Sequence, residues 1–173
     1  VYEFNDQLIL PGFIDSHVHT FYGAMHLDSI SLGDTKSEEE AARKVYEFYK
    51  DRDDEWVFGF EWAAYFWESK QLPTKRSLDK FFPDRPVCLF NEEMHGVWVN
   101  SKALEICNIT KETTDPEMGT IFRDENGEPT GYLLETAAFL VTAKALKFAP
   151  EKLEEMMLNY YRAAATYGIT SMS

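Results

Sequence analysis

The stretch LILPGFIDSHVHT, residues 8–20, places Asp15, His17 and His19 at every second position. Side chains two positions apart on a β-strand point to the same face, so the two histidines would direct their imidazoles toward one point. Zinc and similar ions bind imidazole nitrogens at about 2.0–2.1 Å. We therefore predict that His17 and His19 are metal ligands. Because H-x-H alone is a weak motif, the alternative is that the pair reflects chance or the polarity of a packed strand.

Asp15 lies on the same predicted face, one step before the histidines. Its carboxylate can hold an imidazole in orientation by a hydrogen bond without touching the metal, as carboxylates beside ligating histidines do. It can equally bond to the backbone. The sequence leaves both interpretations open.

The histidine pair is predicted to lie on one β-strand, and a second predicted strand would lie beside it. FIDSHVH, residues 13–19, is a short run rich in apolar residues, which is typical of a buried parallel strand. ITSMS, residues 169–173, begins another strand. A helix over 150–167, with Pro150 in its first turn and Gly168 at its end, is expected to join the two strands as a right-handed crossover.

A long mixed segment separates these two strands. Ser37, followed three residues later by Glu40, forms a capping box that begins a helix. Asn126-Gly127 lies between two apolar stretches and predicts a β-hairpin with a tight turn. The remaining predicted elements are strands over 55–62 and 85–92 and helices from Thr74 to Phe82, from Asn100 or Ser101, and over 135–147.

Composition excludes several classes of partner. The 173 residues carry 30 acidic and 17 basic side chains, a net charge of −13, which repels phosphate backbones, so we expect no nucleic-acid partner. No apolar run approaches the ~20 residues that cross a bilayer, and the first residues are not cationic as in a signal peptide, so we expect no membrane partner. Cys88 and Cys107 lack C-x-x-C spacing and are interpreted as reduced thiols of a cytoplasmic protein, with a disulfide as the alternative.

Several segments together resemble one known family. LILPGFIDSHVHT resembles the strand-one motif of the amidohydrolase superfamily of metal-dependent hydrolases. The later segments resemble, in order, the branch of that superfamily that includes the N-substituted formamide deformylases. These segments are LPTKRSLDKFFPDRPVCLFNEEMHGVWVNSKALE, GTIFRDENGEPTGYLLE and YGITSMS.

The resemblance implies an α/β fold, namely a partial (β/α)8 TIM barrel with its first two strands and an inserted α+β subdomain. Residues 1–12 would be the end of a β-sandwich segment and the entry to the barrel, and residues 13–54 barrel strand one and the following helix. Residues 55–135 would be the inserted subdomain. Residues 136–173 would be helices and a truncated barrel strand two. The chain would thus be the N-terminal fragment of a longer protein, since a complete barrel takes ~250 residues.

The resemblance also implies an activity. The parent protein would hydrolyse the C–N bond of a small amide, formamide or cyclic amide through metal-activated water, with one or two divalent ions, zinc by expectation, on His17 and His19. Its other ligands and its catalytic carboxylate would lie beyond Ser173, so we expect the fragment alone to be inactive. A homo-oligomer is compatible with this. The alternative is a stand-alone, non-catalytic module that binds metal or another protein.

Two further residues are candidate substrate contacts. His95 matches a histidine that the family places in the inserted subdomain facing the active-site mouth, although Glu92-Glu93-Met94 departs from the usual Asp-Gly before it. The alternative for His95 is to cap the turn before Gly96. Trp62 belongs to an aromatic cluster that can line an apolar substrate pocket or pack in the core.

Overall fold

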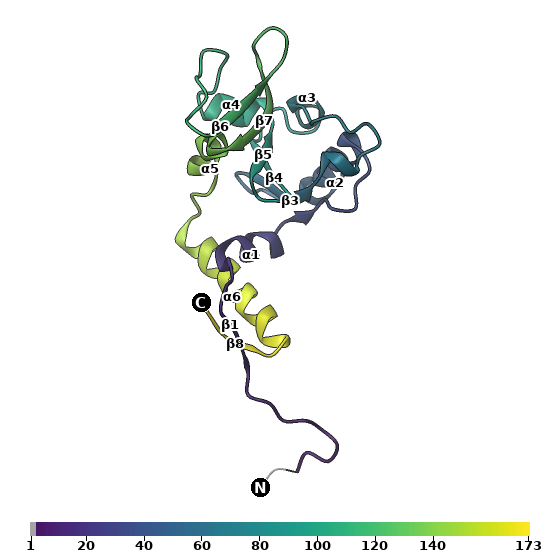
Figure 1. The fold of residues 1–173 in the computed structure, drawn as a ribbon, viewed down its shortest axis with the longest axis vertical. Helices are drawn as coiled ribbons and strands as arrows, with labels where there is room; N and C mark the ends of the chain where they lie inside the picture. The colour runs from purple at the N-terminus through teal and green to yellow at the C-terminus, as the bar shows by residue number, and fades with distance from the viewer. Residues whose placement is uncertain (1–2) are drawn as a thin grey trace. The chain divides into compact units, whose positions relative to one another are not determined.

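The computed structural model describes residues 3–173 and divides them into two compact units (Figure 1). Unit one combines residues up to Asp28 with Phe148–Ser173, and unit two is Ser29–Lys147. The described part of the predicted β-sandwich segment, residues 3–12, has a turn closed by the backbone N–H of Gln7 on the carbonyl of Phe4 and contains no strand. Residues 1 and 2 lie outside the described part of the chain.

Unit one is built on a parallel strand pair. β1 (Phe13–Asp15) pairs with β8 (Ile169–Met172), with Phe13 opposite Ile169 and Asp15 opposite Met172. The long helix α6 (Pro150–Thr166) leads directly into β8, with proline in its first turn. This confirms the predicted parallel neighbours and the helix before the second strand. These two strands form a two-stranded sheet, whereas the barrel that the resemblance implies has eight strands.

The predicted strand over residues 13–19 is wrong in its length. β1 ends at Asp15, and the chain then bends and enters α1 (Thr20–Leu27), a helix that the sequence reading did not predict. The Asp15 carboxylate accepts the backbone N–H of His17 at 3.2 Å. Such a local bond from side chain to backbone competes with a strand ladder and ends it. The two histidines therefore follow the strand and do not lie on it.

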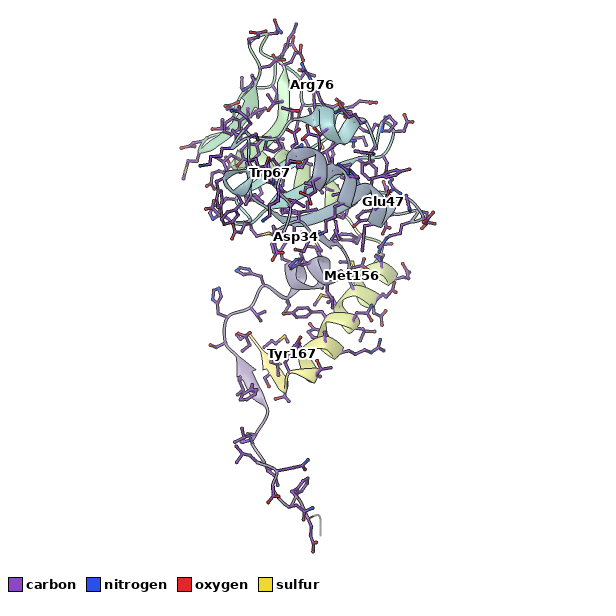
Figure 2. The ribbon with its side chains drawn as sticks, turned by 90° about the vertical axis from the view of Figure 1, so that its right-hand side faces the viewer. Asp34, Glu47, Trp67, Arg76, Met156 and Tyr167 are labelled. Carbon is purple, nitrogen blue, oxygen red and sulfur yellow. The ribbon has the colours of Figure 1, made fainter. Side chains whose placement is uncertain are left out.

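Two helices of unit one pack closely. Ala24 and Met25 of α1 are buried, as are Met156, labelled in Figure 2, and Ala164 of α6. A Cβ added at Gly23 would lie 2.5 Å from a ring carbon of Tyr160, so a larger residue would require the tyrosine ring to move. Lys152 of α6 also forms an ion pair with Asp28 at 2.7 Å. The helix that follows the histidines is thereby held in place.

Unit two is a mixed six-stranded sheet. Its order is β2-β3-β4-β5-β7-β6, in which β2, β3 and β4 are parallel and the remaining pairs are antiparallel. The strands are β2 (Ile30–Ser31), β3 (Val57–Trp62), β4 (Val87–Asn91), β5 (Gly96–Val99), β6 (Gly119–Arg123) and β7 (Pro129–Glu135). The α/β fold class is confirmed.

Helical segments accompany this sheet. They are α2 (Glu38–Tyr49), η1 (Ala64–Phe66), α3 (Lys75–Asp79), α4 (Ser101–Ile106), η2 (Thr136–Ala138) and α5 (Phe139–Ala145). α2 contacts β2, β3 and α3, and its Ala41, Val45 and Tyr49 are buried. The helix that was assigned to the barrel within residues 13–54 therefore belongs to unit two. The observed unit is wider at both ends than the predicted subdomain 55–135.

The predicted hairpin is confirmed, with a different turn. β6 and β7 pair antiparallel on either side of the loop 124–128. Only Gly127 in this loop has a positive φ, +81°. Asp124 organises the turn, because its carboxylate accepts the backbone N–H groups of Asn126 and Glu128 at 2.9 and 3.0 Å. The loop is therefore longer than a two-residue Asn-Gly turn.

The core of unit two is rich in aromatic rings. Trp62 lies 5.9 Å from Trp67, 6.0 Å from Trp98 and 5.3 Å from Tyr132, measured between ring centroids. Trp67, labelled in Figure 2, is 1% exposed and Trp98 is fully buried. Each of the three indole N–H groups donates a hydrogen bond, which makes burial of this polar group favourable.

The capping box at the start of α2 gives the first testable prediction. Ser37 Oγ accepts the N–H of Glu40 at 3.1 Å, and the Glu40 carboxylate accepts the N–H of Lys36 at 2.7 Å. Ser37→Ala leaves an N–H of the first helical turn without its acceptor and should lower the free energy of unfolding by about 1 kcal/mol. Urea unfolding measures this loss. Ser37→Asn, which keeps a capping oxygen, should behave like the wild type, and equal stability of both variants would contradict the prediction.

Candidate functional site

His17 and His19 lie just beyond the carboxyl end of β1. The segment that carries them stays attached to β8, because Ser173 N–H donates to Asp15 O at 2.9 Å and Val18 N–H donates to Ser173 O at 3.2 Å. His19 is the N-cap residue of α1, and its carbonyl accepts the N–H of Gly23 at 2.9 Å. Both histidines are exposed. The strand pair and α1 thus fix the backbone on each side of the pair.

The spacing of the two imidazoles fits a shared metal ion. Their ring centroids are 5.4 Å apart and their planes meet at 82°. Two imidazoles bound to one tetrahedral ion at 2.0–2.1 Å would place their centroids about 5 Å apart. The two rings come together through a bend and a helix start and not through alternation along a strand, and their role as metal ligands stays a prediction.

The pair offers two candidate metal ligands. Within residues 3–173 no group of three or more His, Cys, Asp or Glu side chains is placed to hold a metal ion. Asp15, whose role was left open, bonds to the backbone N–H of His17. That hydrogen bond orients the loop that carries the histidine. The donor chemistry fits part of a metal centre, and a complete centre needs further ligands.

His95 contacts the carboxylate of Glu135, a partner that the sequence did not indicate. Its Nδ1 lies 3.0 and 3.2 Å from the two carboxylate oxygens of Glu135, and its carbonyl accepts the N–H of Glu135 at 2.7 Å. Both side chains are more than half exposed. The turn before Gly96 is instead closed by Asn91, whose Oδ1 accepts the Gly96 N–H at 2.9 Å. Capping this turn is therefore not the role of the His95 side chain.

Trp62 lies mostly in the core. It is 2% exposed, and its Nε1 donates to the carbonyl of Leu89 at 2.9 Å. The predicted aromatic cluster divides accordingly, because Trp62 and Trp67 are buried whereas Tyr65 and Phe66 are 56% and 60% exposed. The remaining surface of Trp62 forms part of the wall of a pocket.

The sequence offered an apolar pocket beside Trp62 as one of two interpretations, but it did not indicate the acidic residues that also line it. The pocket has a volume of about 260 Å³ and lies at the carboxyl ends of the parallel strands β3 and β4. Ligands commonly bind at this end of parallel strands. Its lining residues are Trp62, Ala63, Ala64, Tyr65, Lys70, Leu72, Asn91, Glu92, Glu93 and Tyr132.

The two cysteines are free, as predicted. Cys88 is buried in β4, and burial raises the pKa of its thiol. Burial also raises the pKa of Cys107. Both thiols are therefore protonated at neutral pH and poor nucleophiles. Among the helices of residues 3–173, none is both long and apolar enough to cross a membrane.

The fold is shared with two solved structures, each described as an uncharacterized metal-dependent hydrolase. The one from Pyrococcus horikoshii OT3 has a TM-score of 0.69 at 24% identity, and the one from Pyrococcus furiosus has 0.68 at 25% identity. Each match covers 94% of this chain and 30% or 31% of the other. The arrangement of the parallel strand pair and of the mixed sheet is therefore shared with these two proteins.

The sequence match identifies the family. Residues 4–173 match the amidohydrolase family, and the chain belongs to it. It is 34% identical over 169 residues to the putative amidohydrolase YtcJ of Bacillus subtilis (strain 168). It is 31% identical over 167 residues to Protein LONG AFTER FAR-RED 3 of Arabidopsis thaliana, and 32% identical over 144 residues to the N-substituted formamide deformylase of Arthrobacter pascens.

These relatives are much longer than the matched region. The matches cover 96%, 96% and 82% of this chain, but 32%, 28% and 27% of the three relatives in the same order. The chain thus spans about a third of the length of the curated relatives it matches. Most of what these relatives contain has no counterpart in the 173 residues.

Proposed function

We propose that this chain is the N-terminal part of a metal-dependent hydrolase that cleaves the C–N bond of a small amide, formamide or cyclic amide. The observation that carries the proposal is the position of His17 and His19 just beyond a parallel strand, with ring centroids 5.4 Å apart, in a member of the amidohydrolase family. The relative named as an N-substituted formamide deformylase supports this choice of bond.

The strand pair is the proposed beginning of a barrel. β1 and β8 would be the first two strands of a (β/α)8 barrel, whose active site lies at the carboxyl ends of its strands. The apolar side chains near β1 support further packing partners, since Leu8, Ile9 and Ile14 are 82%, 64% and 73% exposed. Uncovered apolar surface of this kind also favours self-association of the isolated chain.

The two imidazoles are suited to a divalent ion, and zinc is the proposed one. His17 and His19 would hold it, and Asp15 would position the loop of His17 through the backbone hydrogen bond. When bound, the ion would act as a Lewis acid toward the amide carbonyl and lower the pKa of water from 15.7 toward about 7. Further ligands and the group that moves the proton are proposed to come from the part of the protein that the relatives have in addition.

The substrate contacts within this chain stay proposals. His95 follows β4, and Trp62 is the last residue of β3. Both therefore lie toward the carboxyl ends of these two strands in unit two. His95 would offer a hydrogen-bonding group fixed by Glu135, and Trp62 would offer an apolar wall. The function is tested by assaying the full-length protein against N-substituted formamides and cyclic amides before and after chelation. Hydrolysis that is indifferent to complete metal removal would refute the proposal.

Ligand number predicts the behaviour of the 173-residue chain alone. A catalytic zinc usually needs three protein ligands and a structural one needs four, whereas His17 and His19 supply two. The isolated chain should therefore retain less than one metal ion per molecule after dialysis and hydrolyse no amide. Elemental analysis and an amide assay measure both quantities. One zinc per chain that survives a chelator would show that the chain supplies a further ligand, with Asp15 and His95 as the first candidates.

A further inference from the structure

The pocket in unit two is lined by apolar residues and by charged residues. Two aromatic side chains line it, Trp62 at the end of β3 and Tyr132 within β7, which are 2% and 7% exposed. Leu72 adds an aliphatic side chain. The backbone N–H of Glu92 donates to the carbonyl of Trp62 at 3.1 Å, which ties the ends of β3 and β4 together. The apolar side of the pocket is therefore part of a packed and hydrogen-bonded core.

The pocket lining also contains two acidic side chains. These are Glu92 and Glu93, which directly follow β4. The hydroxyl of Tyr65 donates to the Glu92 carboxylate, and this hydrogen bond is the main reason why the pKa of Tyr65 is raised. Burial raises the pKa of Tyr132, and the negative charge of Glu93 adds to that effect. Each carboxylate thus contributes to the raised pKa of a tyrosine that lines the same pocket.

We propose that this pocket binds a small organic ammonium ion, with its charge on Glu92 and Glu93 and its apolar body against Trp62 and Tyr132. Carboxylates form charge-assisted hydrogen bonds with ammonium groups, and aromatic faces attract cations. The volume of about 260 Å³ lies below the roughly 300–1,000 Å³ of pockets for drug-sized molecules, so the ligand is small.

Lys70 is the one cationic side chain in the pocket lining, and its positive charge could oppose the binding of an ammonium ion. It is exposed and has a long flexible stem, so its ammonium group can remain in water at the rim. Two carboxylates against one ammonium group leave the lining with a net negative charge. An anionic ligand would have to bind at Lys70 while facing both glutamates, which electrostatics opposes.

This inference goes beyond the proposed hydrolase activity and does not require it. The pocket residues belong to unit two, whereas His17 and His19 belong to unit one. Binding of the ammonium ion should therefore be the same in the presence of a chelator. Failure of metal binding at the histidines and failure of ligand binding at the pocket are separate experimental results.

The test is a comparison of three probes of similar size and different charge on the 173-residue chain. They are 2-phenylethylammonium, 2-phenylethanol and 3-phenylpropionate, titrated in a chelator-containing buffer. All four tryptophans lie in unit two, and Trp62 lines the pocket, so tryptophan fluorescence reports binding. We expect the ammonium ion to bind at least about tenfold more tightly than the alcohol, and more weakly in high salt. Equal affinity for alcohol and ammonium ion, or preference for the carboxylate, would overturn the proposal.

Variants locate the binding. Replacing both glutamates, Glu92→Gln with Glu93→Gln, should weaken ammonium binding about tenfold and leave affinity for the alcohol unchanged. Glu125→Gln removes one negative charge from the exposed hairpin loop and should have no effect. Tyr65→Phe is a second pocket variant, which keeps the ring and frees Glu92 from its hydrogen bond, so binding should not weaken. Unchanged ammonium affinity in the double variant would refute the assignment.

Discussion

Replacing His17 or His19 by alanine in the full-length protein is expected to remove the bound metal and abolish turnover. Each variant leaves one imidazole of the pair, and the chain offers no third ligand within residues 3–173 to take the lost place. Loss of an outer-shell partner of a metal ligand already costs about 10–100-fold in affinity or activity. Loss of a ligand itself should cost more, so turnover should fall below detection in most assays.

The measurement combines metal content with the rate of amide hydrolysis in the same preparations. His26→Ala is the matched control, because His26 also lies in unit one, on α1, and is not part of the proposed centre. Circular dichroism should show that all three variants keep their secondary structure, since both ligand histidines are exposed. Full metal content and normal turnover in either His17→Ala or His19→Ala would rule out the proposed centre.

The elements that the sequence predicted well are those whose signals are local. Pro150 and the glycine at position 168 marked the two ends of α6, and Gly168 has a φ of +78°. Ser37 and Glu40 marked the start of α2. The expected hydrogen bond from Glu40 N–H to Ser37 Oγ is present, whereas the Glu40 carboxylate accepts the N–H of Lys36 in place of that of Ser37. In each case a few adjacent residues determine the backbone, so no knowledge of distant contacts was needed.

The errors arose where a distant or competing contact decides the structure. β1 is shorter than predicted because Asp15 bonds to the backbone of His17. The N-cap residue of α1 is His19, and its side chain makes no capping hydrogen bond. The sequence therefore contained no capping residue that would predict the start of this helix. α2 was predicted from its capping box, but its place in unit two follows from its contacts with β2, β3 and α3, which are distant in sequence or unpredicted.

The candidate sites divide in the same way. His17 and His19 are two positions apart, so their rings lie near each other although the predicted strand ends before them. His95 and Glu135 meet across 40 residues of sequence, through pairing of β5 with β7. The pocket combines side chains from β3, β4 and β7 with those from the loops that follow β3 and β4. Such a site depends on the sheet order, which the sequence reading did not determine.

The side chain of Asn100 is expected to be one of the most important single contributors to the stability of unit two. It is fully buried, and its Oδ1 accepts the N–H groups of Val87 and Ala103, both at 3.0 Å. Its Nδ2 donates to the carbonyls of Phe82 and Arg85 at 2.7 and 2.9 Å. One amide therefore joins the chain after α3, the start of β4 and the first turn of α4, with all its hydrogen-bonding capacity used.

Asn100→Ala should lower the free energy of unfolding by about 4 kcal/mol, because each buried partner left unsatisfied costs roughly 1–3 kcal/mol and some regain water. Urea unfolding followed by tryptophan fluorescence measures the loss in unit two, which contains all four tryptophans. Asn126→Ala, at an exposed position of the hairpin loop, is the control and should change stability by less than about 0.5 kcal/mol.

Asn100→Asp separates the hydrogen-bond argument from simple loss of volume. The aspartate has nearly the same shape and keeps an acceptor for Val87 and Ala103, but it replaces the donating Nδ2 with an oxygen that faces the carbonyls of Phe82 and Arg85. A buried charge against two carbonyl oxygens should destabilise unit two at neutral pH at least as much as Asn100→Ala. If Asn100→Asp were as stable as the wild type at neutral pH, the two donated hydrogen bonds could not be important for the fold.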